Sequence, residues 1–167
     1  MAKKENKIYI VDVTNRDGVQ TSRLGLAKLQ KTMINLYLND MGVSQSEFGF
    51  PVTRHETNYL NANVELARMG VLKPIILSGW IRAIKEDVEK AVKMTNVRNL
   101  NLSISTSDQM IDGKFPGRVT RDDVTRMMVD AVETAWKLGV EYVAVNAEDA
   151  SRTDIDYLVK FVMVLQP

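Results

Sequence analysis

The sequence alternates short apolar runs with longer segments of helical periodicity, five times in strict order. Runs rich in β-branched residues are typical of strands, and apolar residues spaced three or four apart are typical of helices. The predicted strands span residues 7–14, 45–50, 73–80, 99–105 and 141–149. The predicted helices span residues 24–42, 55–70, 83–95, 120–139 and 151–164, and a polar loop is expected after the fourth strand, to about Val119. This alternation predicts an α/β fold in which helices connect the strands of a parallel sheet.

Two architectures satisfy this pattern: an open doubly wound sheet and a (β/α)8 TIM barrel. A complete barrel typically takes about 250 residues, and this chain has 167. Five β–α units in this length agree with the number of residues per unit in a barrel, so the chain matches a barrel that ends after its fifth unit. We therefore expect residues 1–167 to form the N-terminal portion of a single catalytic TIM-barrel domain, with strands six to eight absent.

Composition excludes several kinds of site. The chain has no cysteine, which excludes disulfides, thiolate metal sites and cysteine nucleophiles. The single histidine, His55, cannot complete a site that needs two or three imidazoles, whereas a carboxylate site for a hard divalent ion remains open. A net charge of +1 gives no support to nucleic-acid or membrane partners. With no signal-peptide pattern and no apolar run of membrane-spanning length, a cytoplasmic protein is expected.

Polar residues gather where each predicted strand ends. The clusters read DVTNRDGVQ (12–20), SEFGFP (46–51), SGWIR (78–82), SISTSD (103–108) and NAEDASRTD (146–154). In parallel α/β folds the carboxyl ends of the strands lie together and carry the residues that handle ligands. The five clusters are therefore expected on one rim.

The residues in these clusters suit a particular chemistry. Arg16 and Asp17 place a fixed cation beside a hard anion, so the aspartate is a candidate metal ligand and the guanidinium a candidate partner for an oxygen that gains negative charge. Glu47 and Glu148 are candidate acid–base or orienting groups on the same rim, and Arg82 is a candidate clamp for a substrate carboxylate.

These residues also have plainer interpretations. Taken alone, Arg16 and Asp17 are an ordinary solvated ion pair in a loop. Ser151 and Asp154 are expected to cap the fifth helix. His55 is expected to be a surface residue rather than a ligand.

Taken together, the clusters resemble the acyl-CoA-dependent synthase and lyase barrels. DVTNRDGVQ is similar to the Asp-x-Thr-Leu-Arg-Asp-Gly-x-Gln signature of homocitrate synthase, 2-isopropylmalate synthase, Re-type citrate synthase and 3-hydroxy-3-methylglutaryl-CoA lyase. NAEDASRTD resembles the fifth-strand motif of the homocitrate and isopropylmalate synthases. With SEFGFP and SISTSD in the same order, the resemblance covers essentially the whole chain.

The resemblance implies a metal-dependent Claisen condensation of acetyl-CoA with a 2-oxo acid. In that reaction Arg16 would polarise the keto oxygen, and Asp17 would ligate a divalent metal (Mg²⁺, Mn²⁺ or Zn²⁺). Gln20 would help to position the substrate or a metal-bound water, and Asn146 would bind substrate. Glu47 and Glu148 fall on acidic positions near the reaction centre, and acetyl-CoA is the implied co-substrate.

Some positions depart from the family pattern. Asn15 replaces the usual leucine and Val19 the usual acidic residue. Trp80, expected in the substrate pocket, stands where lysine-pathway homocitrate synthases place a histidine. The 2-oxo acid therefore stays open between oxaloacetate, which would give citrate, and 2-oxoglutarate, which would give homocitrate. A 2-isopropylmalate-synthase-like enzyme that uses a branched 2-oxo acid is the alternative.

The family takes two further metal ligands from a His-x-His pair on a later strand, which this sequence does not contain. The isolated chain is therefore expected to have little or no condensing activity. Three explanations are considered: a fragment, one subunit of a split enzyme with a complementing C-terminal subunit, or a homo-oligomer of partial barrels. A non-catalytic partial barrel that stabilises a partner subunit is a further alternative.

Overall fold

The computed structural model describes residues 8–115, 117 and 119–166. The strands are β1 (Val11–Asp12), β2 (Gln45–Gly49), β3 (Ile76–Arg82), β4 (Asn99–Ser105) and β5 (Tyr142–Glu148). The α-helices are α1 (Lys28–Asp40), α2 (Arg54–Arg68), α3 (Lys85–Met94), α4 (Asp108–Lys114), α5 (Arg121–Lys137) and α6 (Ile155–Val164). Two short 3₁₀ helices, η1 (Gly18–Gln20) and η2 (Ala150–Arg152), follow β1 and β5.

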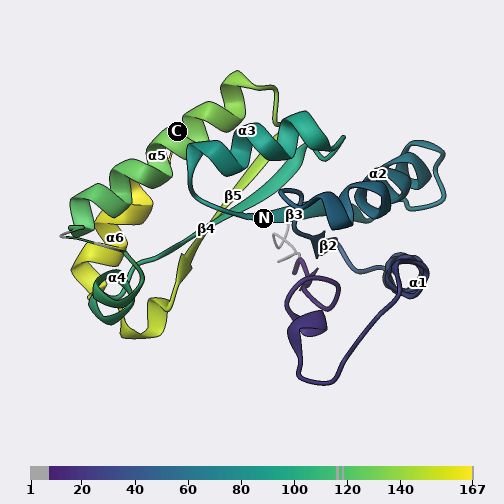
Figure 1. Cartoon of the computed structure of the whole chain (residues 1–167), viewed down its shortest axis with the longest axis horizontal. Helices are drawn as coiled ribbons and strands as arrows, with labels where there is room; N and C mark the ends of the chain where they lie inside the picture. Colours follow the sequence, from purple (N-terminus) through teal and green to yellow (C-terminus); the bar gives the residue numbers. More distant parts are fainter. Residues whose placement is uncertain (1–7, 116, 118, 167) are drawn as a thin grey trace, which may run out of the picture.

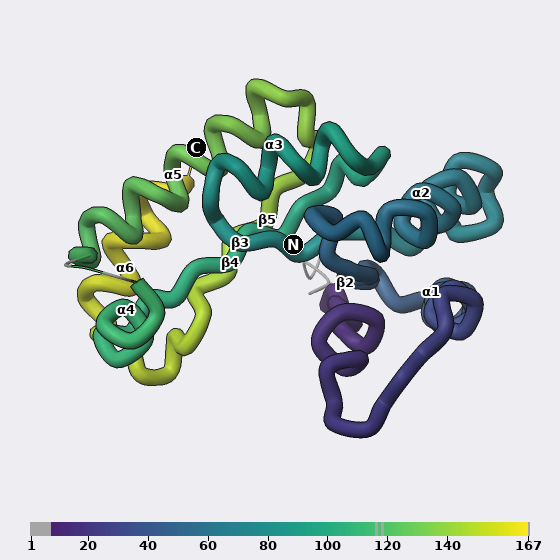
Figure 2. The backbone as a smooth tube through the Cα atoms, viewed as in Figure 1, coloured from purple at the N-terminus to yellow at the C-terminus, as the bar shows by residue number. Residues whose placement is uncertain are grey.

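All five strands pair in parallel and in chain order, β1-β2-β3-β4-β5. A doubly wound sheet reverses its strand order at a switch point, and this sheet has no reversal. Right-handed crossovers that always step in one direction put every helix on the same face. The helices accordingly follow one another around the sheet, from α1 and α2 at one end through α3 to α5 and α6 at the other (Figures 1 and 2). This arrangement is that of the first five β–α units of a barrel and confirms the predicted fold class.

Strand β4 shows how the sequence divides the sheet into two unlike faces. Its residues Leu100, Leu102 and Ile104 are buried in the core with Val88 of α3 and Met128 of α5. The alternate residues of β4 point to the opposite face, because side chains alternate along a strand. They are all polar: Asn99, Asn101, Ser103 and Ser105. At β4 the face of the sheet away from the helices is therefore polar, and the candidate site lies on that face.

The first predicted strand is much shorter than expected. From residue 8 onward, where the description of the chain begins, the ladder with β2 contains only Val11 and Asp12, although the carbonyl of Ile10 still accepts a hydrogen bond from the backbone N–H of Gln45. Ile8 and Ile10 are exposed, and residue 7 lies outside the described part of the chain. An apolar run indicates strand propensity but does not specify how many of its residues find a partner.

The expected polar loop after the fourth strand contains helix α4. Ser107 caps this helix, since its Oγ accepts from the backbone N–H of Met110 at 3.3 Å. The first helix begins at Lys28 rather than 24, and the last begins at Ile155 with Asp154 as its N-cap, as expected for that aspartate. The signal for α4 was a serine N-cap followed by an acidic residue, which is a short pattern within a polar stretch.

Gly79 of β3 lies against the ring of Pro51 and gives a test of this packing. A Cβ at position 79 would lie 2.7 Å from Cγ and 2.9 Å from Cδ of Pro51. Gly79→Ala is therefore expected to lower the free energy of unfolding by about 2 kcal/mol, measured by urea denaturation. Gly113→Ala in α4 is the matched control, because a Cβ there would meet no atom within 4 Å. Equal stability of the two variants would contradict a close approach of Pro51 to Gly79.

Candidate active site

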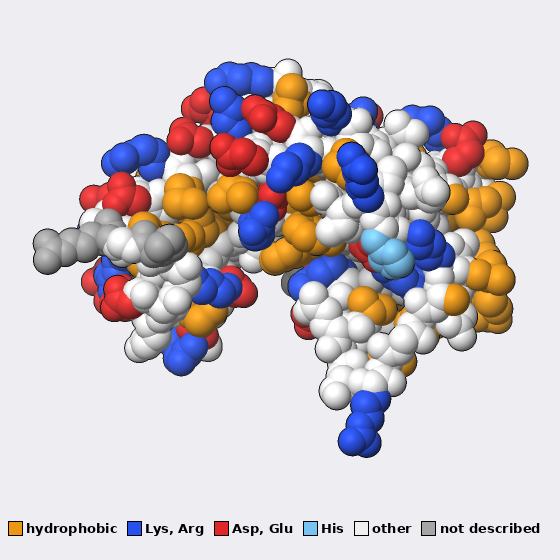
Figure 3. Space-filling model, in the orientation of Figure 1, with side chains coloured by type: hydrophobic (Ala, Val, Ile, Leu, Met, Phe, Trp, Pro, Cys, Tyr) orange, Lys and Arg blue, Asp and Glu red, His pale blue; other side chains and the backbone are white. Residues whose placement is uncertain are grey.

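A cavity of about 510 Å³ opens on the polar face of the sheet. In the space-filling view the molecule is hollowed between its N-terminal segment and the side that carries α4 and α6 (Figure 3). Residues from β1 and its following turn and from all the other strands line the cavity. Six of the residues singled out from the sequence are among them: Arg16, Asp17, Glu47, Trp80, Asn146 and Glu148.

The turn after β1 is shaped by its own polar residues. The carboxylate of Asp12 accepts hydrogen bonds from the backbone N–H of Thr14 at 2.9 Å and from its hydroxyl at 3.0 Å. The carbonyl of Val13 then accepts from the backbone N–H groups of residues 16–18. This local bonding of an aspartate to the chain that follows is a common way to end a strand and start a turn. It brings Arg16 and Asp17 to the cavity.

Arg16 is held by a buried carboxylate. Its Nε donates to Oε1 of Glu47 at 2.7 Å, and its Nη1 donates to Oδ1 of Asp17 at 3.0 Å. Glu47 is only 3% exposed, and its Oε2 accepts from Nδ2 of Asn101 at 2.6 Å. Because Glu47 is bonded at both oxygens, it fixes the guanidinium rather than presenting a free carboxylate to the cavity.

The indole of Trp80 holds the flat side of the same guanidinium. The Cζ atom of Arg16 lies 4.8 Å from the centre of the Trp80 ring, within the range of a cation–π contact. Trp80 in turn packs against Phe50, with ring centres 5.6 Å apart. Within the described residues, Nη2 of Arg16 has no hydrogen-bond partner, so this nitrogen is available to an acceptor that enters the cavity.

Glu148 lies at the end of β5, where one cation and one hydroxyl bond to its side chain. Its Oε2 accepts from Oγ of Ser105 and from Nζ of Lys114, each at 2.6 Å. Burial alone would raise the pKa of the Glu148 carboxyl, but the hydrogen bonds from Lys114 and Ser105 outweigh burial and hold this pKa below its ordinary value. Glu148 is therefore ionised at neutral pH.

Asp17 is the one predicted metal ligand, and the described residues do not complete a metal site around it. Its side chain is 60% exposed and faces Arg16. Among the described residues no group of three or more histidine, aspartate or glutamate side chains is arranged to hold a metal ion. Divalent ions in proteins are usually held by several such donors. The donor set of this part of the chain is therefore not sufficient for the implied metal.

Two predicted substrate-binding residues lie elsewhere. Gln20 is exposed in η1 and does not line the cavity. Arg82 makes two hydrogen bonds to the fully buried carboxylate of Asp87, from Nε at 2.7 Å and from Nη2 at 2.9 Å. These hydrogen bonds raise the pKa of Arg82. The guanidinium of Arg82 thus already has a carboxylate partner at the start of α3.

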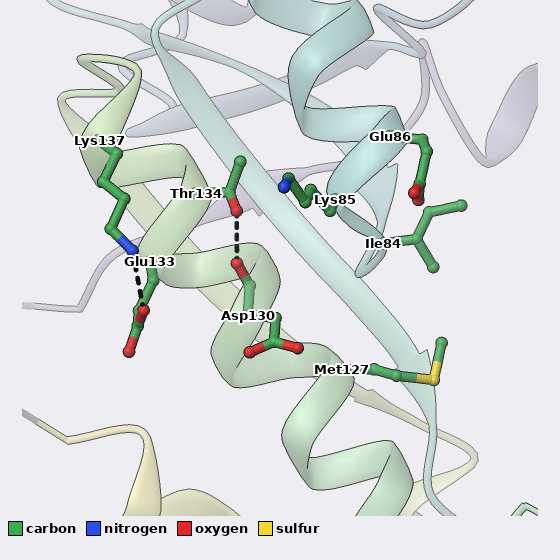
Figure 4. A pocket seen from close by; sticks show the side chains of 8 residues that line it. All are labelled: Ile84, Lys85, Glu86, Met127, Asp130, Glu133, Thr134 and Lys137. Atoms are coloured by element: carbon green, nitrogen blue, oxygen red, sulfur yellow. Dashed lines mark hydrogen bonds and ion pairs between the residues drawn. The ribbon is translucent and has the colours of Figure 1, made fainter.

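A second cavity, of about 470 Å³, adjoins the first. The two share Ser103 and Glu148, and Arg82, Lys114 and Phe115 line the second. A third cavity, of about 440 Å³, lies between α3 and α5 on the outer side of the sheet (Figure 4). Two of its lysines pair within their own helix: Lys137 with Glu133 at 3.1 Å and Lys85 with Glu89 at 3.8 Å. No strand residue lines the third cavity, so it lies apart from the chemistry of the strand ends.

Sequence reasoning missed two residues that organise the site. Asn101 bonds to Glu47 across 54 positions of the chain, and Lys114 bonds to Glu148 across 34. A signal for Asn101 was present, because NLNLSIS alternates polar and apolar residues and so marks one polar face. Lys114 had no comparable signal, since the helix that carries it was expected to be a loop.

A family model described as HMGL-like matches residues 7–166 of the chain. The chain is 60% identical over 156 residues to citrate (Re)-synthase of Dehalococcoides mccartyi, covering 93% of this chain and 38% of that protein. It is 41% identical to 2-isopropylmalate synthase 2 of Caldanaerobacter subterraneus, covering 95% and 39% respectively. It is 37% identical to homocitrate synthase AksA of Methanocaldococcus jannaschii, covering 92% and 36%. The chain thus spans less than two fifths of the length of these relatives.

A solved structure shares the fold. The HMG-CoA lyase of Bacillus subtilis superposes with a TM-score of 0.66 at 16% identity, covering 95% of this chain and 54% of that one. At this identity the likeness concerns the fold alone, and it agrees with the barrel order of the strands. No helix in the described ranges is both long and apolar enough to cross a membrane.

Proposed function

The chain belongs to the HMGL-like family, and we propose that it forms the N-terminal part of the catalytic barrel of a synthase that condenses acetyl-CoA with oxaloacetate to give citrate. The observation that carries the proposal is the fixed guanidinium of Arg16 at the carboxyl ends of the strands, held by Glu47 and Trp80, while its Nη2 has no hydrogen-bond partner in the part of the chain that the structure describes. Oxaloacetate is preferred because the relative that is 60% identical is named citrate (Re)-synthase.

The condensation needs a site that stabilises negative charge on oxygen. The methyl group of acetyl-CoA loses a proton, the resulting carbanion attacks the keto carbon of the oxo acid, and the former keto oxygen becomes an alkoxide. We assign to Arg16 the hydrogen bond to that oxygen, because a preorganised cation is most effective where charge develops. The alkoxide then takes up a proton, and hydrolysis of the thioester releases CoA.

Glu47 and Glu148 have different roles in this proposal. Glu47 is buried and bonded at both oxygens, so it positions Arg16. Glu148 lies where the two cavities meet. Its lowered pKa makes it a weak base. We therefore assign Glu148 the task of orienting Lys114 and Ser105 in its ionised form.

The family resemblance implies a divalent metal, which would polarise the keto oxygen when bound. Asp17 is the candidate ligand within the described residues, and the other ligands would come from outside them. We propose that the rest of the barrel, from the same polypeptide or from a complementing subunit, provides these ligands. The steps assigned above to Arg16, Glu47 and Glu148 do not depend on their identity.

A substrate comparison tests the proposal. CoA release from acetyl-CoA is measured for the full-length protein that carries this chain, with oxaloacetate, 2-oxoglutarate and 2-oxoisovalerate in turn. The highest kcat/KM is expected with oxaloacetate. A clear preference for 2-oxoisovalerate would support the second candidate, a 2-isopropylmalate synthase, which the 41% identical relative favours.

The ionised state of Glu148 gives a pH-dependent prediction. Lys114→Met removes a hydrogen bond that lowers the pKa of Glu148, so this pKa rises. Activity that needs ionised Glu148 is lost as the pH falls through its pKa, and the acid limb of the profile of kcat/KM against pH is therefore expected to move to higher pH. Lys137→Met is the control, because Lys137 pairs with Glu133 on the outer side of α5. If the acid limb lay at the same pH in both variants, Lys114 would not be the residue that lowers the pKa of Glu148.

A further inference from the structure

Among the described residues, no backbone hydrogen bond joins the turn that carries Arg16 to strand β2. In the described ranges the ladder between β1 and β2 has two residue pairs, the second of which joins Asp12 to Ser46. Beyond it, the backbone N–H groups of residues 16–18 donate to Val13 within the turn itself. These bonds shape the turn but leave its position relative to β2 to other contacts.

One buried oxygen on α1 connects the turn and the strand. Oδ1 of Asn35 accepts from Nδ2 of Asn15 at 2.8 Å and from Oγ of Ser46 at 2.9 Å. All three side chains are fully buried. Asn15 immediately precedes Arg16, and Ser46 immediately precedes Glu47. A single atom therefore holds the neighbours of the two residues whose side chains meet at 2.7 Å in the cavity.

The amide of Asn35 is itself fixed. Its Nδ2 donates to the hydroxyl of Tyr59 at 3.1 Å and to Oδ1 of Asn63 at 3.0 Å, both on α2. Nδ2 of Asn15 also donates to the carbonyl of Lys31 at 2.8 Å. With bonds to helix α2, strand β2 and the turn after β1, the amide of Asn35 has little freedom to rotate, so the oxygen shared by the turn and β2 stays in place.

Burying the amide of Asn15 costs free energy of folding, which indicates that the amide positions its neighbours rather than stabilising the fold. Oδ1 of Asn15 is the one buried side-chain polar atom without a hydrogen-bond partner among the described residues. A buried polar atom without a partner lowers the stability of the folded state. An apolar side chain of the same size would avoid that cost but would donate nothing to Asn35 or Lys31.

We propose that Asn15, Asn35 and Ser46 form a clamp that sets the spacing between Arg16 and Glu47, and that they are positioning residues for the condensation. The assignment of a catalytic task to Arg16 rests on the proposed function. The clamp itself rests on the hydrogen bonds described above and is tested separately from the reaction.

Kinetics of the full-length protein test the functional part. Asn15→Leu and Ser46→Ala each remove one donor to Oδ1 of Asn35. Each is expected to lower kcat/KM for the oxo acid about 10- to 100-fold, because small misplacements of catalytic groups are costly. The double variant is expected to have a kcat/KM no lower than that of the more impaired single variant, because either change alone opens the clamp. Thr95→Val, which removes another buried hydroxyl bonded to backbone, is the control and is expected to change kcat/KM less than about twofold. Equal kinetic losses in all three single variants would overturn the proposal in favour of a general loss of stability.

Hydrogen–deuterium exchange tests the structural part without any substrate. In the Asn15→Leu variant the amides of residues 16–21 are expected to exchange faster than in the wild type, while those of β4 are unchanged. Unchanged exchange at residues 16–21 would overturn the clamp. If the wild-type protein condensed none of the three oxo acids, the proposed function would fall, and the exchange result would still decide whether the clamp exists.

Discussion

Replacing Arg16 by methionine is expected to lower kcat/KM of the full-length protein for oxaloacetate about 1000-fold. Methionine keeps much of the length and apolar contact of the side chain but removes every N–H group. The buried Glu47 then loses the donor at 2.7 Å, and the cavity loses the nitrogen available to a substrate oxygen. CoA release at subsaturating oxaloacetate measures the change directly.

Two further variants separate charge from geometry at this position. Arg16→Lys keeps the positive charge but cannot bond Glu47 and Asp17 while lying flat on Trp80, so an intermediate loss is expected. Arg126→Met changes a mostly exposed arginine of α5 and controls for the loss of a surface charge. An Arg16→Met variant within tenfold of the wild type would favour the non-catalytic alternative, a partial barrel that only stabilises a partner.

Replacing Glu47 by glutamine is expected to lower kcat/KM about 100-fold. The two oxygens of Glu47 accept from Arg16 and from Asn101. Glutamine has one oxygen and one amide nitrogen. Either Arg16 or Asn101 therefore faces the amide nitrogen, which is itself a donor, and the negative charge beside Arg16 is lost. The guanidinium is then free to leave its place over Trp80. Steady-state kinetics with oxaloacetate measure the loss, and Glu65→Gln on the exposed side of α2 is the matched control.

A double-mutant cycle distinguishes the two roles that the sequence left open for Glu47. If Glu47 acts through Arg16, the double variant Arg16→Met/Glu47→Gln is no slower than Arg16→Met alone. If Glu47 exchanged a proton with the substrate, the two losses would multiply. The contacts at both of its oxygens favour the first result, and multiplicative losses would contradict it.

Much of the fold was predictable because it depends on local patterns. Five apolar runs in alternation with helical segments specify a parallel sheet, and the lengths of the elements agree with it. The failures occurred where pairing or tertiary contact overrides local pattern. Apolarity from residue 7 onward did not reveal that only Val11 and Asp12 enter the ladder, and the polar composition of residues 106–119 concealed α4.

The candidate site was predicted in part for a similar reason. The position of a residue at the carboxyl end of a strand could be inferred from the sequence, which explains why Arg16, Glu47, Trp80 and Glu148 line one cavity. The partner of each side chain could not be inferred. Arg82 bonds to the buried Asp87 only because α3 begins beside the end of β3. Asn101 of β4 reaches Glu47 of β2 across the intervening strand β3, and no local spacing records such a contact.

The central claim is that this chain carries the oxyanion-stabilising half of a citrate-forming barrel. The most direct measurement incubates the full-length protein with isotopically labelled acetyl-CoA and oxaloacetate and identifies the product by mass spectrometry. Labelled citrate is expected from the wild type, with its formation reduced about 1000-fold in Arg16→Met. Absence of labelled citrate from the wild type, or equal amounts from both proteins, would contradict the account.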